Sequence, residues 1–371
     1  MLDNIPTPAL LLDRPRFERN IKRLEARLAR LGVPLRPHMK TAKSVDILRL
    51  MAPAAITVST LKEAEVFAQA GARDILYAVG LAPGKIARVR ALRGRGVGLS
   101  VVVDSVEGAQ ALAASGGEPV PALIEIDTDG HRAGVAPGDA ERLLAIGRAL
   151  HAGPGSALKG VMTHAGGSYG AFDEAAHAEA AERERSGAVE AAESLRTAGL
   201  PCPVVSVGST PTAHAARSLA GVTEVRAGVY MFGDLVQAGL GVIGTEDIAL
   251  SVLASVIGHQ RDKGWILIDA GWMALSRDRG TSGHEVDQGY GLVASADGVP
   301  WPDLIVYDAN QEHGVIALRP GSGAALPELQ VGDLVRILPN HACATAAQHD
   351  CYRVIGSDGA LEAEWPRFNG W

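Results

Sequence analysis

The first two thirds of the chain alternate short apolar runs with longer stretches rich in Ala, Leu, Glu and Arg. Apolar runs without polar alternation are typical of strands buried on both faces, and the longer stretches are typical of amphipathic helices. Eight strands are expected, at residues 33–40, 55–60, 74–80, 98–104, 121–129, 159–164, 202–209 and 223–228. Eight strands with crossover helices predict a (β/α)8 barrel over residues 10–240, with an open doubly wound sheet as the alternative.

The connecting helices are expected at residues 14–31, 61–71, 83–93, 105–115, 137–152, 173–199 and 211–219. Ser105 and Asp173 stand at the start of two of these stretches. Short polar side chains at such positions accept hydrogen bonds from the first-turn N–H groups, so we expect both residues to cap their helices.

The pattern changes after about residue 240, where strand-like runs are separated by turn signals such as Asp-Gly at 297–298. Six runs are expected as strands, at residues 248–260, 264–271, 304–310, 313–320, 333–340 and 351–357. Closely spaced strands without long intervening helices predict a mostly antiparallel β domain over residues 241–371, together with residues 1–9. A literal G-x-G-x-x-G at 239–244 lacks the following helix that a dinucleotide site needs.

Composition and charge narrow the functional classes. The chain has 371 residues, a formal net charge of −7 and no block of like charges, which argues against nucleic-acid binding. Its apolar runs fall short of the roughly 20 residues that cross a bilayer, and the N-terminus lacks the features of a signal peptide. Three cysteines do not build a disulfide scaffold. We therefore expect a reduced, cytoplasmic, soluble protein.

The first motif with chemical potential is RPHMKTAK at 36–43, which ends the first predicted strand. Barrel enzymes form their active sites at the carboxyl ends of the strands, so Lys40 would project there with His38 two residues before it on the same face. A partly desolvated lysine can form a Schiff base with a carbonyl compound. The alternative is an ordinary exposed lysine at a strand end.

Two Gly-containing loops follow the seventh and eighth predicted strands, VGSTPT at 207–212 and RAGVYMFGD at 226–234. Ser209 and Thr210 offer hydroxyl and N–H groups at a helix start, which is a common anion site. Gly228 would let the backbone approach a ligand closely, and phosphate sites in barrel enzymes recur after strands 7 and 8. Turn and capping roles are the alternative for these residues.

The third motif is NHACATA at 340–346 in the β domain. If residues 338–345 are extended, His341 and Cys343 point to the same side. An imidazole and a thiolate together are suitable ligands for Zn²⁺ or a similar ion, with positions left for water and substrate. A buried cysteine beside a packed histidine is the alternative. His349 and Cys351 repeat the spacing, but we expect them to be structural at the start of a strand.

Other polar residues follow the fifth and sixth predicted strands, namely Arg132, His164 and Tyr169. Each of these can contact a cofactor ring or serve only as a loop residue, and their spacing does not decide between the two.

Several of these segments together resemble the fold-type III pyridoxal-phosphate enzymes, which share the alanine racemase N-terminal barrel and include D-serine dehydratases and D-threonine aldolases. The resemblance rests on TPALLLD near the start, RPHMKT with Lys40, the barrel-then-β organisation and PNHACAT. It covers essentially the whole chain. Within the group, the chain is most similar to bacterial 3-hydroxyaspartate dehydratases, in segments including ITVSTLKEAE, IEIDTDGHRAGV, VSVGSTPTA, TEVRAGVY, DAGWMALSRDRGT, NQEHG and ILPNHACAT.

The resemblance implies two cofactors. Lys40 would carry pyridoxal 5'-phosphate covalently and take the substrate α-proton as general base. His341 and Cys343 would bind a divalent metal, Zn²⁺, Mn²⁺ or Mg²⁺, that acts as a Lewis acid on the β-hydroxyl. The remaining cofactor contacts would come from His38, Arg132, His164, Tyr169, Ser209, Thr210, Gly228 and Tyr230, with Ser209, Thr210, Gly228 and Tyr230 at the phosphate and Arg132 at the ring oxygen.

The implied reaction is elimination from a β-hydroxy amino acid, converting D-threo-3-hydroxyaspartate to oxaloacetate and ammonia, with D-serine to pyruvate as a related activity. His-x-Cys is typical of the dehydratases of this group and His-x-Asp of its aldolases, so Cys343 favours elimination. A D-threonine aldolase and a non-catalytic cofactor carrier are the alternatives. Arg277 and Arg279 are candidates for the second substrate carboxylate, or else solvated loop residues. The family also implies a homodimer in which the β domain completes the partner's active site.

Overall fold

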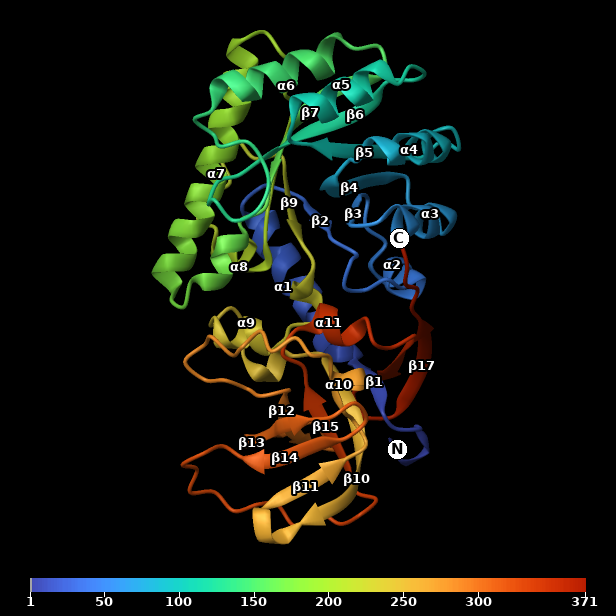
Figure 1. Cartoon of the computed structure of the whole chain (residues 1–371), viewed down its shortest axis with the longest axis vertical. Helices are drawn as coiled ribbons and strands as arrows, with labels where there is room; N and C mark the ends of the chain where they lie inside the picture. The colour runs from blue at the N-terminus through green and yellow to red at the C-terminus, as the bar shows by residue number, and fades with distance from the viewer. Residues whose placement is uncertain (1) are drawn as a thin grey trace. The chain divides into compact units, whose positions relative to one another are not determined.

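A computed structural model describes residues 2–371 and divides the chain into two compact units (Figure 1). The barrel unit comprises residues 23–228 with 370–371, and the β unit comprises the residues up to 22 together with 229–369. One boundary lies inside helix α1 (Arg14–Arg30) and the other follows strand β9 (Glu224–Ala227). Residues 10–22 and 229–240, which we assigned to the barrel, therefore group with the β unit.

The barrel unit contains a parallel sheet of eight strands in the order β2-β9-β8-β7-β6-β5-β4-β3. A parallel bridge between His38 and Thr57 joins the two end strands of this order, so the sheet closes on itself. The predicted barrel is confirmed. Its strands, besides β9, are β2 (Leu35–Pro37), β3 (Ile56–Val58), β4 (Asp74–Gly80), β5 (Gly98–Val103), β6 (Val120–Ile126), β7 (Ser156–Thr163) and β8 (Val204–Val207).

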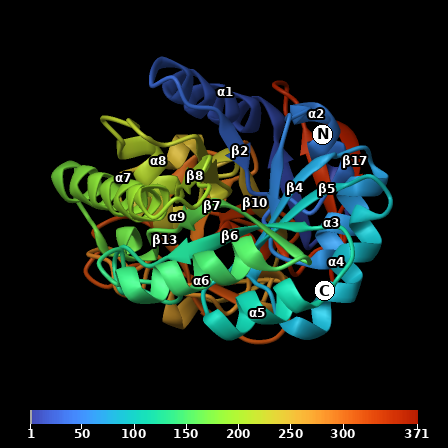
Figure 2. The same ribbon diagram turned by 90° about the horizontal axis from the view of Figure 1, so that it is seen from above.

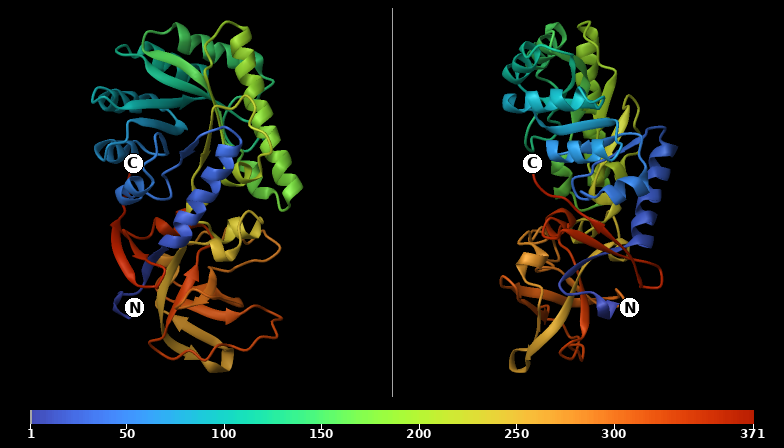
Figure 3. Two further views of the ribbon diagram at one scale, coloured as in Figure 1. Left: turned by 180° about the vertical axis from the view of Figure 1, so that it is seen from behind. Right: turned by 90° about the vertical axis from the view of Figure 1, so that its right-hand side faces the viewer.

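Helices cover the outer face of this sheet, as the view from above shows for α5 to α8 (Figure 2). Ser105 and Asp173 cap α5 and α7 as predicted, accepting hydrogen bonds from the N–H groups of Gly108 and Ala176. The long helix α7 follows one side of the barrel (Figure 3). The helices are α2 (Val45–Met51), α3 (Leu61–Gln69), α4 (Ile86–Arg93), α5 (Val106–Ala114), α6 (Ala140–Ala152), α7 (Glu174–Thr197) and α8 (Thr210–Ala215), with 3-10 turns η2 (Pro83–Lys85) and η3 (Gly166–Gly170).

The β unit is built on a nine-stranded sheet in the order β11-β14-β13-β12-β15-β10-β1-β16-β17. The pairing of β1 with β16 is parallel and the other pairings are antiparallel, as expected of a mostly antiparallel domain. The strands are β1 (Ala9–Asp13), β10 (Leu250–Gln260), β11 (Trp265–Ile268), β12 (Leu292–Ser295), β13 (Pro300–Ala309), β14 (Gly314–Leu318), β15 (Leu334–Leu338), β16 (Cys351–Ile355) and β17 (Leu361–Pro366).

Short helices connect the strands of the β unit: η1 (Leu2–Asn4), η4 (Val229–Met231), α9 (Leu235–Gly239), η5 (Thr245–Asp247), η6 (Arg261–Lys263), α10 (Trp272–Leu275) and α11 (Ala342–Ala346). One core cluster of this unit packs Leu11 of β1 against Leu253 of β10 and Ile355 of β16. Burial of such side chains is the main force that holds the sheet together. No helix in residues 2–371 is long and apolar enough to cross a membrane.

Candidate active site

Lys40 lies just beyond β2, at the carboxyl end of the barrel strands. The turn that carries it is held from both sides. The His38 N–H donates to the carbonyl of Ala227 at 2.7 Å, and the Met39 N–H donates to the carbonyl of Thr57 at 2.8 Å. The Lys40 N–H in turn donates to His38 Nδ1 at 3.3 Å. Two neighbouring strands thus fix the backbone at Lys40, while its side chain is exposed.

The loops after β7 and β8 lie side by side at the same end of the barrel. His164 Nδ1 is 3.1 Å from the carbonyl oxygen of Gly208, and the hydroxyls of Ser168 and Ser209 are 3.0 Å apart. Gly208 has a φ of +137°, and a Cβ there would lie 2.0 Å from the carbonyl oxygen of Arg226. Only glycine fits at this close approach of β8 to β9.

The hydroxyl groups of Ser209 and Thr210 show whether the loop after β8 can bind an anion, as predicted. Ser209 is the N-cap of α8, and its Oγ accepts from the Thr212 N–H at 3.2 Å. Thr210 Oγ1 is buried and has no hydrogen-bond partner among residues 2–371. A buried hydroxyl without a partner is costly, and a phosphate oxygen would satisfy it. A Cβ on Gly228 would lie 3.1 Å from the His38 carbonyl, so this segment packs tightly beside the turn before Lys40.

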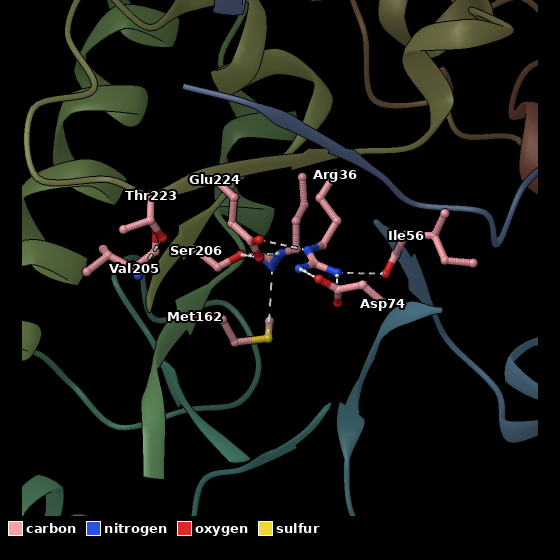
Figure 4. A network of polar contacts seen from close by, with 9 residues as sticks. Arg36, Ile56, Asp74, Met162, Val205, Ser206, Thr223 and Glu224 are labelled. Carbon is pink, nitrogen blue, oxygen red and sulfur yellow. Dashed lines mark hydrogen bonds and ion pairs between the residues drawn. The ribbon is translucent and has the colours of Figure 1, made fainter. Parts of the chain in front are cut away.

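A network of charged side chains lies inside the barrel (Figure 4). Glu224 accepts from Ser206 Oγ and from Arg36 Nε, both at 2.7 Å, and Arg36 also pairs with Asp74 at 2.9 Å. Arg226 is 4% exposed and lies 3.3 Å from Ser206 Oγ through its Nε. Buried charges need polar partners. Arg36 has two carboxylates, Glu224 and Asp74, whereas the Arg226 guanidinium donates to the Ser206 hydroxyl and to the carbonyl of Thr163.

The two histidines near Lys40 are neutral. Burial, and then the charges of Lys40, Arg226 and Arg132, lower the pKa of His164 to about 3 against one favourable backbone hydrogen bond. Burial and the charges of Lys40, Arg226 and His164 likewise hold the pKa of His38 well below its ordinary value. The structure thus brings together Lys40, His38 and His164 with the buried cation Arg226, which we had not predicted. Lys40 and Arg226 act as cations on both histidines, and these cations suit an anionic ligand.

The loops of Arg132 and Tyr169 contact each other. Asp129 Oδ2 accepts from the N–H of Gly167 at 2.7 Å, which holds the turn η3, containing Tyr169, against the loop after β6. Arg132 lies 3.7 Å from Glu125 and keeps 61% of its side chain exposed. Tyr230, which we also predicted at the phosphate, is buried in η4 and groups with the β unit.

Sequence reasoning missed Glu184, a buried carboxylate on α7. It accepts from the N–H of Ala165 at 3.0 Å and from the N–H of Gly208 at 2.9 Å, so it joins the loops after β7 and β8. Burial raises its pKa, against the effect of these hydrogen bonds. The available signal was a glutamate on the alanine-rich face of α7, between buried Ala181 and Ala188.

The predicted metal pair lies in the β unit, with one correction. The expected extended backbone over 338–345 is wrong, because β15 ends at Leu338 and residues 342–346 form α11. His341 is the N-cap of this helix and Cys343 lies in its first turn. Side chains in a helix lean towards its N-terminus, which brings Cys343 back to His341. The two side chains are hydrogen-bonded.

A carboxylate that we had not predicted holds the imidazole. Asp278 Oδ2 lies 2.6 Å from His341 Nδ1. Burial lowers the pKa of His341, but the hydrogen bonds to Asp278 and Cys343 outweigh burial and raise it to about 11. A carboxylate on one ring nitrogen is the usual support of a metal-binding histidine, because it orients the other nitrogen towards the ion.

Three further hydrogen bonds fix the helix that carries Cys343. The buried carboxylate of Asp234 accepts from the N–H groups of Ala342 and Gln237, both at 2.9 Å. The hydroxyl of Thr345 donates to the carbonyl of Leu275 at 2.9 Å. The position of α11 is therefore set by α9 on one side and by the end of α10 on the other.

His341 and Cys343 fit a divalent ion, since an ion can replace the proton that they share and accept both lone pairs. No group of three or more His, Cys, Asp and Glu side chains within residues 2–371 is arranged to hold a metal. His349 and Cys351, which share the spacing, are arranged differently. His349 Nε2 is 3.0 Å from the carbonyl of Ala274, and Cys351 Sγ contacts the carbonyl of Tyr352 at 3.4 Å.

Known protein families match both units. Residues 12–236 match the alanine racemase N-terminal domain, and residues 249–355 match a putative serine dehydratase domain. The chain is 54% identical to D-threo-3-hydroxyaspartate dehydratase of Delftia sp. (strain HT23), over 99% of this chain and 98% of that protein. It is 29% identical to D-serine dehydratase of Dictyostelium discoideum, over 97% of this chain and 96% of that protein.

Solved structures agree with these matches. The Delftia dehydratase superposes with a TM-score of 0.96, covering 100% of this chain and 99% of that one. A D-threo-3-hydroxyaspartate dehydratase variant with one cysteine replaced by alanine, in the metal-free form, gives the same TM-score and coverage at 54% identity. D-threonine aldolase of Filomicrobium marinum is 26% identical, with a TM-score of 0.81, over 98% of this chain and 96% of that one.

Proposed function

Because this chain belongs to the family of the alanine racemase N-terminal domain, we propose that it is a lyase dependent on pyridoxal 5'-phosphate and a divalent metal. It converts D-threo-3-hydroxyaspartate to oxaloacetate and ammonia, and D-serine to pyruvate and ammonia as a related activity. The observation that carries this proposal is the pair His341 and Cys343, supported by Asp278, in a chain 54% identical over its length to a dehydratase of that substrate.

In the barrel unit, Lys40 binds the cofactor and takes the proton from the substrate α-carbon. When bound, pyridoxal phosphate supplies an electron sink for that carbon, and the metal supplies a Lewis acid for the β-hydroxyl. The lowered pKa values of His38 and His164 make both imidazoles weak bases, which leaves Lys40 as the proton-accepting group of this cluster. Ser209, Thr210, Gly228 and Tyr230 hold the phosphate, Arg132 binds the ring oxygen, and Tyr169 lines the ring.

In the β unit, His341 Nε2 and Cys343 Sγ hold the metal. A thiolate favours Zn²⁺, while Mn²⁺ and Mg²⁺ are the alternatives that we retain. The metal-free form of a related dehydratase that lacks one cysteine supports a metal role for Cys343. We also propose a homodimer, as the family resemblance implies, and a cytoplasmic location, where the free thiols of Cys202, Cys343 and Cys351 stay reduced.

The test is to supply the purified protein with pyridoxal phosphate and Zn²⁺, Mn²⁺ or Mg²⁺. Its products from D-threo-3-hydroxyaspartate, D-serine and D-threonine are then identified. Oxaloacetate from D-threo-3-hydroxyaspartate, with weaker formation of pyruvate from D-serine, is the expected result. Glycine and acetaldehyde from D-threonine, without 2-oxo acids from the other two, would make the protein an aldolase. That outcome would show that Cys343 does not determine the reaction.

A further inference from the structure

A short loop after α10 is attached to the metal-binding segment at two points. Before the loop, the carbonyl of Leu275 accepts from Thr345 Oγ1 at 2.9 Å, and within it Asp278 Oδ2 lies 2.6 Å from His341 Nδ1. Arg277 stands between these two attachments. Because consecutive Cα atoms are about 3.8 Å apart, its backbone cannot lie far from the metal pair.

The backbone immediately before Arg277 is strained. Ser276 has φ 76° and ψ 157°, a conformation found almost only in glycine, and its side chain is 7% exposed. Its Oγ accepts from the N–H of Asp278 at 3.1 Å, which helps to hold this geometry. Strained residues persist where the surrounding structure enforces them, and they cluster at functional sites. The strained backbone at Ser276 fixes the directions in which the side chains of Arg277 and Asp278 extend.

The two arginines of this loop differ in what they contact. Arg279 lies 2.5 Å from Asp287, and its guanidinium is 5.4 Å from the ring centroid of Tyr290. Arg277 is exposed and lies 4.7 Å over the ring of Trp272. In the part of the chain that the structure describes, no carboxylate forms an ion pair with Arg277. Stacking on tryptophan orients a guanidinium and leaves its N–H edge available for an anion.

If the proposed function is correct, the structure of the substrate determines where the protein needs a second cation. In 3-hydroxyaspartate, the β-carbon carries both the hydroxyl that the metal would bind and the second carboxylate. A metal bound to His341 and Cys343 therefore brings that carboxylate to the same neighbourhood. Guanidinium groups bind carboxylates through two parallel hydrogen bonds. We propose that Arg277 binds the side-chain carboxylate and sets the preference for 3-hydroxyaspartate over D-serine.

The test compares Arg277→Gln and Arg277→Lys with a matched control, Lys263→Gln. Lys263 is also an exposed cation stacked on a tryptophan, 4.6 Å over Trp265, but it lies outside this loop. In the enzyme loaded with both cofactors, Arg277→Gln should lower kcat/KM for D-threo-3-hydroxyaspartate about 10- to 100-fold. The value for D-serine should stay within about twofold, because D-serine lacks the carboxylate. Arg277→Lys should fall between, since lysine is a point charge without the fork.

A binding measurement separates this proposal from the reaction itself. D-aspartate carries the second carboxylate but no hydroxyl, and D-alanine carries neither, so calorimetric titration of the holoenzyme with both isolates the carboxylate contact. Arg277→Gln should weaken D-aspartate about tenfold or more and leave D-alanine unchanged. If the wild-type enzyme forms no 2-oxo acid from D-threo-3-hydroxyaspartate or D-serine, the proposed function fails. The titration with D-aspartate and D-alanine still tests the role of Arg277 in that case. An unchanged affinity for D-aspartate, or equal losses on both substrates, would overturn the role of Arg277.

Discussion

Two histidines, one in each unit, experience opposite electrostatic surroundings. His164 in the barrel lies near Lys40 and Arg226, and burial together with these cations lowers its pKa to about 3. His341 in the β unit is held by Asp278 and Cys343, which raise its pKa to about 11 against burial. The barrel centre therefore suits an anion, such as a phosphate, and the centre in the β unit suits a cation.

The two centres also differ in how they are assembled. The barrel centre draws residues from the ends of several strands, between His38 and Gly228, so its formation requires the closed sheet. The centre in the β unit needs only the start of α11 and the loop after α10, attached by Asp278 and Thr345. The contrast predicts that loss of one centre leaves the other able to bind its own ligand.

The largest effect is expected for Lys40→Ala. Removing the amine removes both the covalent attachment of the cofactor and the general base, so kcat should fall by about 10⁴-fold or more. The absorbance band of lysine-bound pyridoxal phosphate should disappear, while metal content measured by atomic emission should not change. Lys159→Ala, which removes an exposed lysine on β7, is the matched control. Full turnover by Lys40→Ala would overturn the role of Lys40.

The next largest effect is expected for Cys343→Ala. Loss of one of two protein ligands should release the metal and lower kcat by about 10²- to 10³-fold, while the absorbance of bound cofactor stays. Exhaustive chelation of the wild type should have the same consequence. Cys351→Ala, which removes the cysteine of the similarly spaced pair, should retain both metal and activity. Unchanged elimination after metal removal would contradict the Lewis-acid role.

A smaller effect is expected for Asp278→Asn. The amide cannot stabilise His341 as the carboxylate does, and such supporting groups are worth about 10- to 100-fold in metal affinity. Titration of the metal-stripped protein against a chromophoric chelator measures this change. Asp262→Asn, an exposed carboxylate in η6 of the same unit, serves as the control. Equal metal affinities for Asp278→Asn and wild type would show that Asp278 only packs against the imidazole.

Much of the fold follows from local pattern. The eight barrel strands were predictable because each is a short apolar run bounded by turn residues, and strands buried on both faces carry that signal strongly. Strand β17 was not, because its alternating, largely exposed residues resemble a polar loop. Helix α11 was mistaken for extended chain because five residues with several alanines give too short a pattern to separate helix from strand.

The candidate site was predictable where one short segment carries the chemistry, as in His341 and Cys343. Its supporting residues were not. Asp278 and His341 are 63 positions apart in the sequence. Glu184 lies on helix α7 and binds the loops after β7 and β8. Spacing along the chain contains no information about such contacts, since they arise only when the sheets place distant loops together.

The smallest effect concerns the pH dependence of barrel stability in the cofactor-free protein. His164 has an ordinary pKa of about 6.5 when unfolded and about 3 when folded, so acid adds a proton to the unfolded state first. Its contribution is fully present above about pH 6.5 and is lost progressively as the pH falls towards 3. At pH 5 the loss is at most about 2 kcal/mol, and we expect about 1 kcal/mol because His164 is only partly buried. Hydrogen exchange in β7 and β8 at pH 7 and 5 measures it, with His164→Gln as the comparison. The variant should lose less stability on acidification than wild type, and equal losses would show that burial and the nearby cations do not lower the pKa of this histidine.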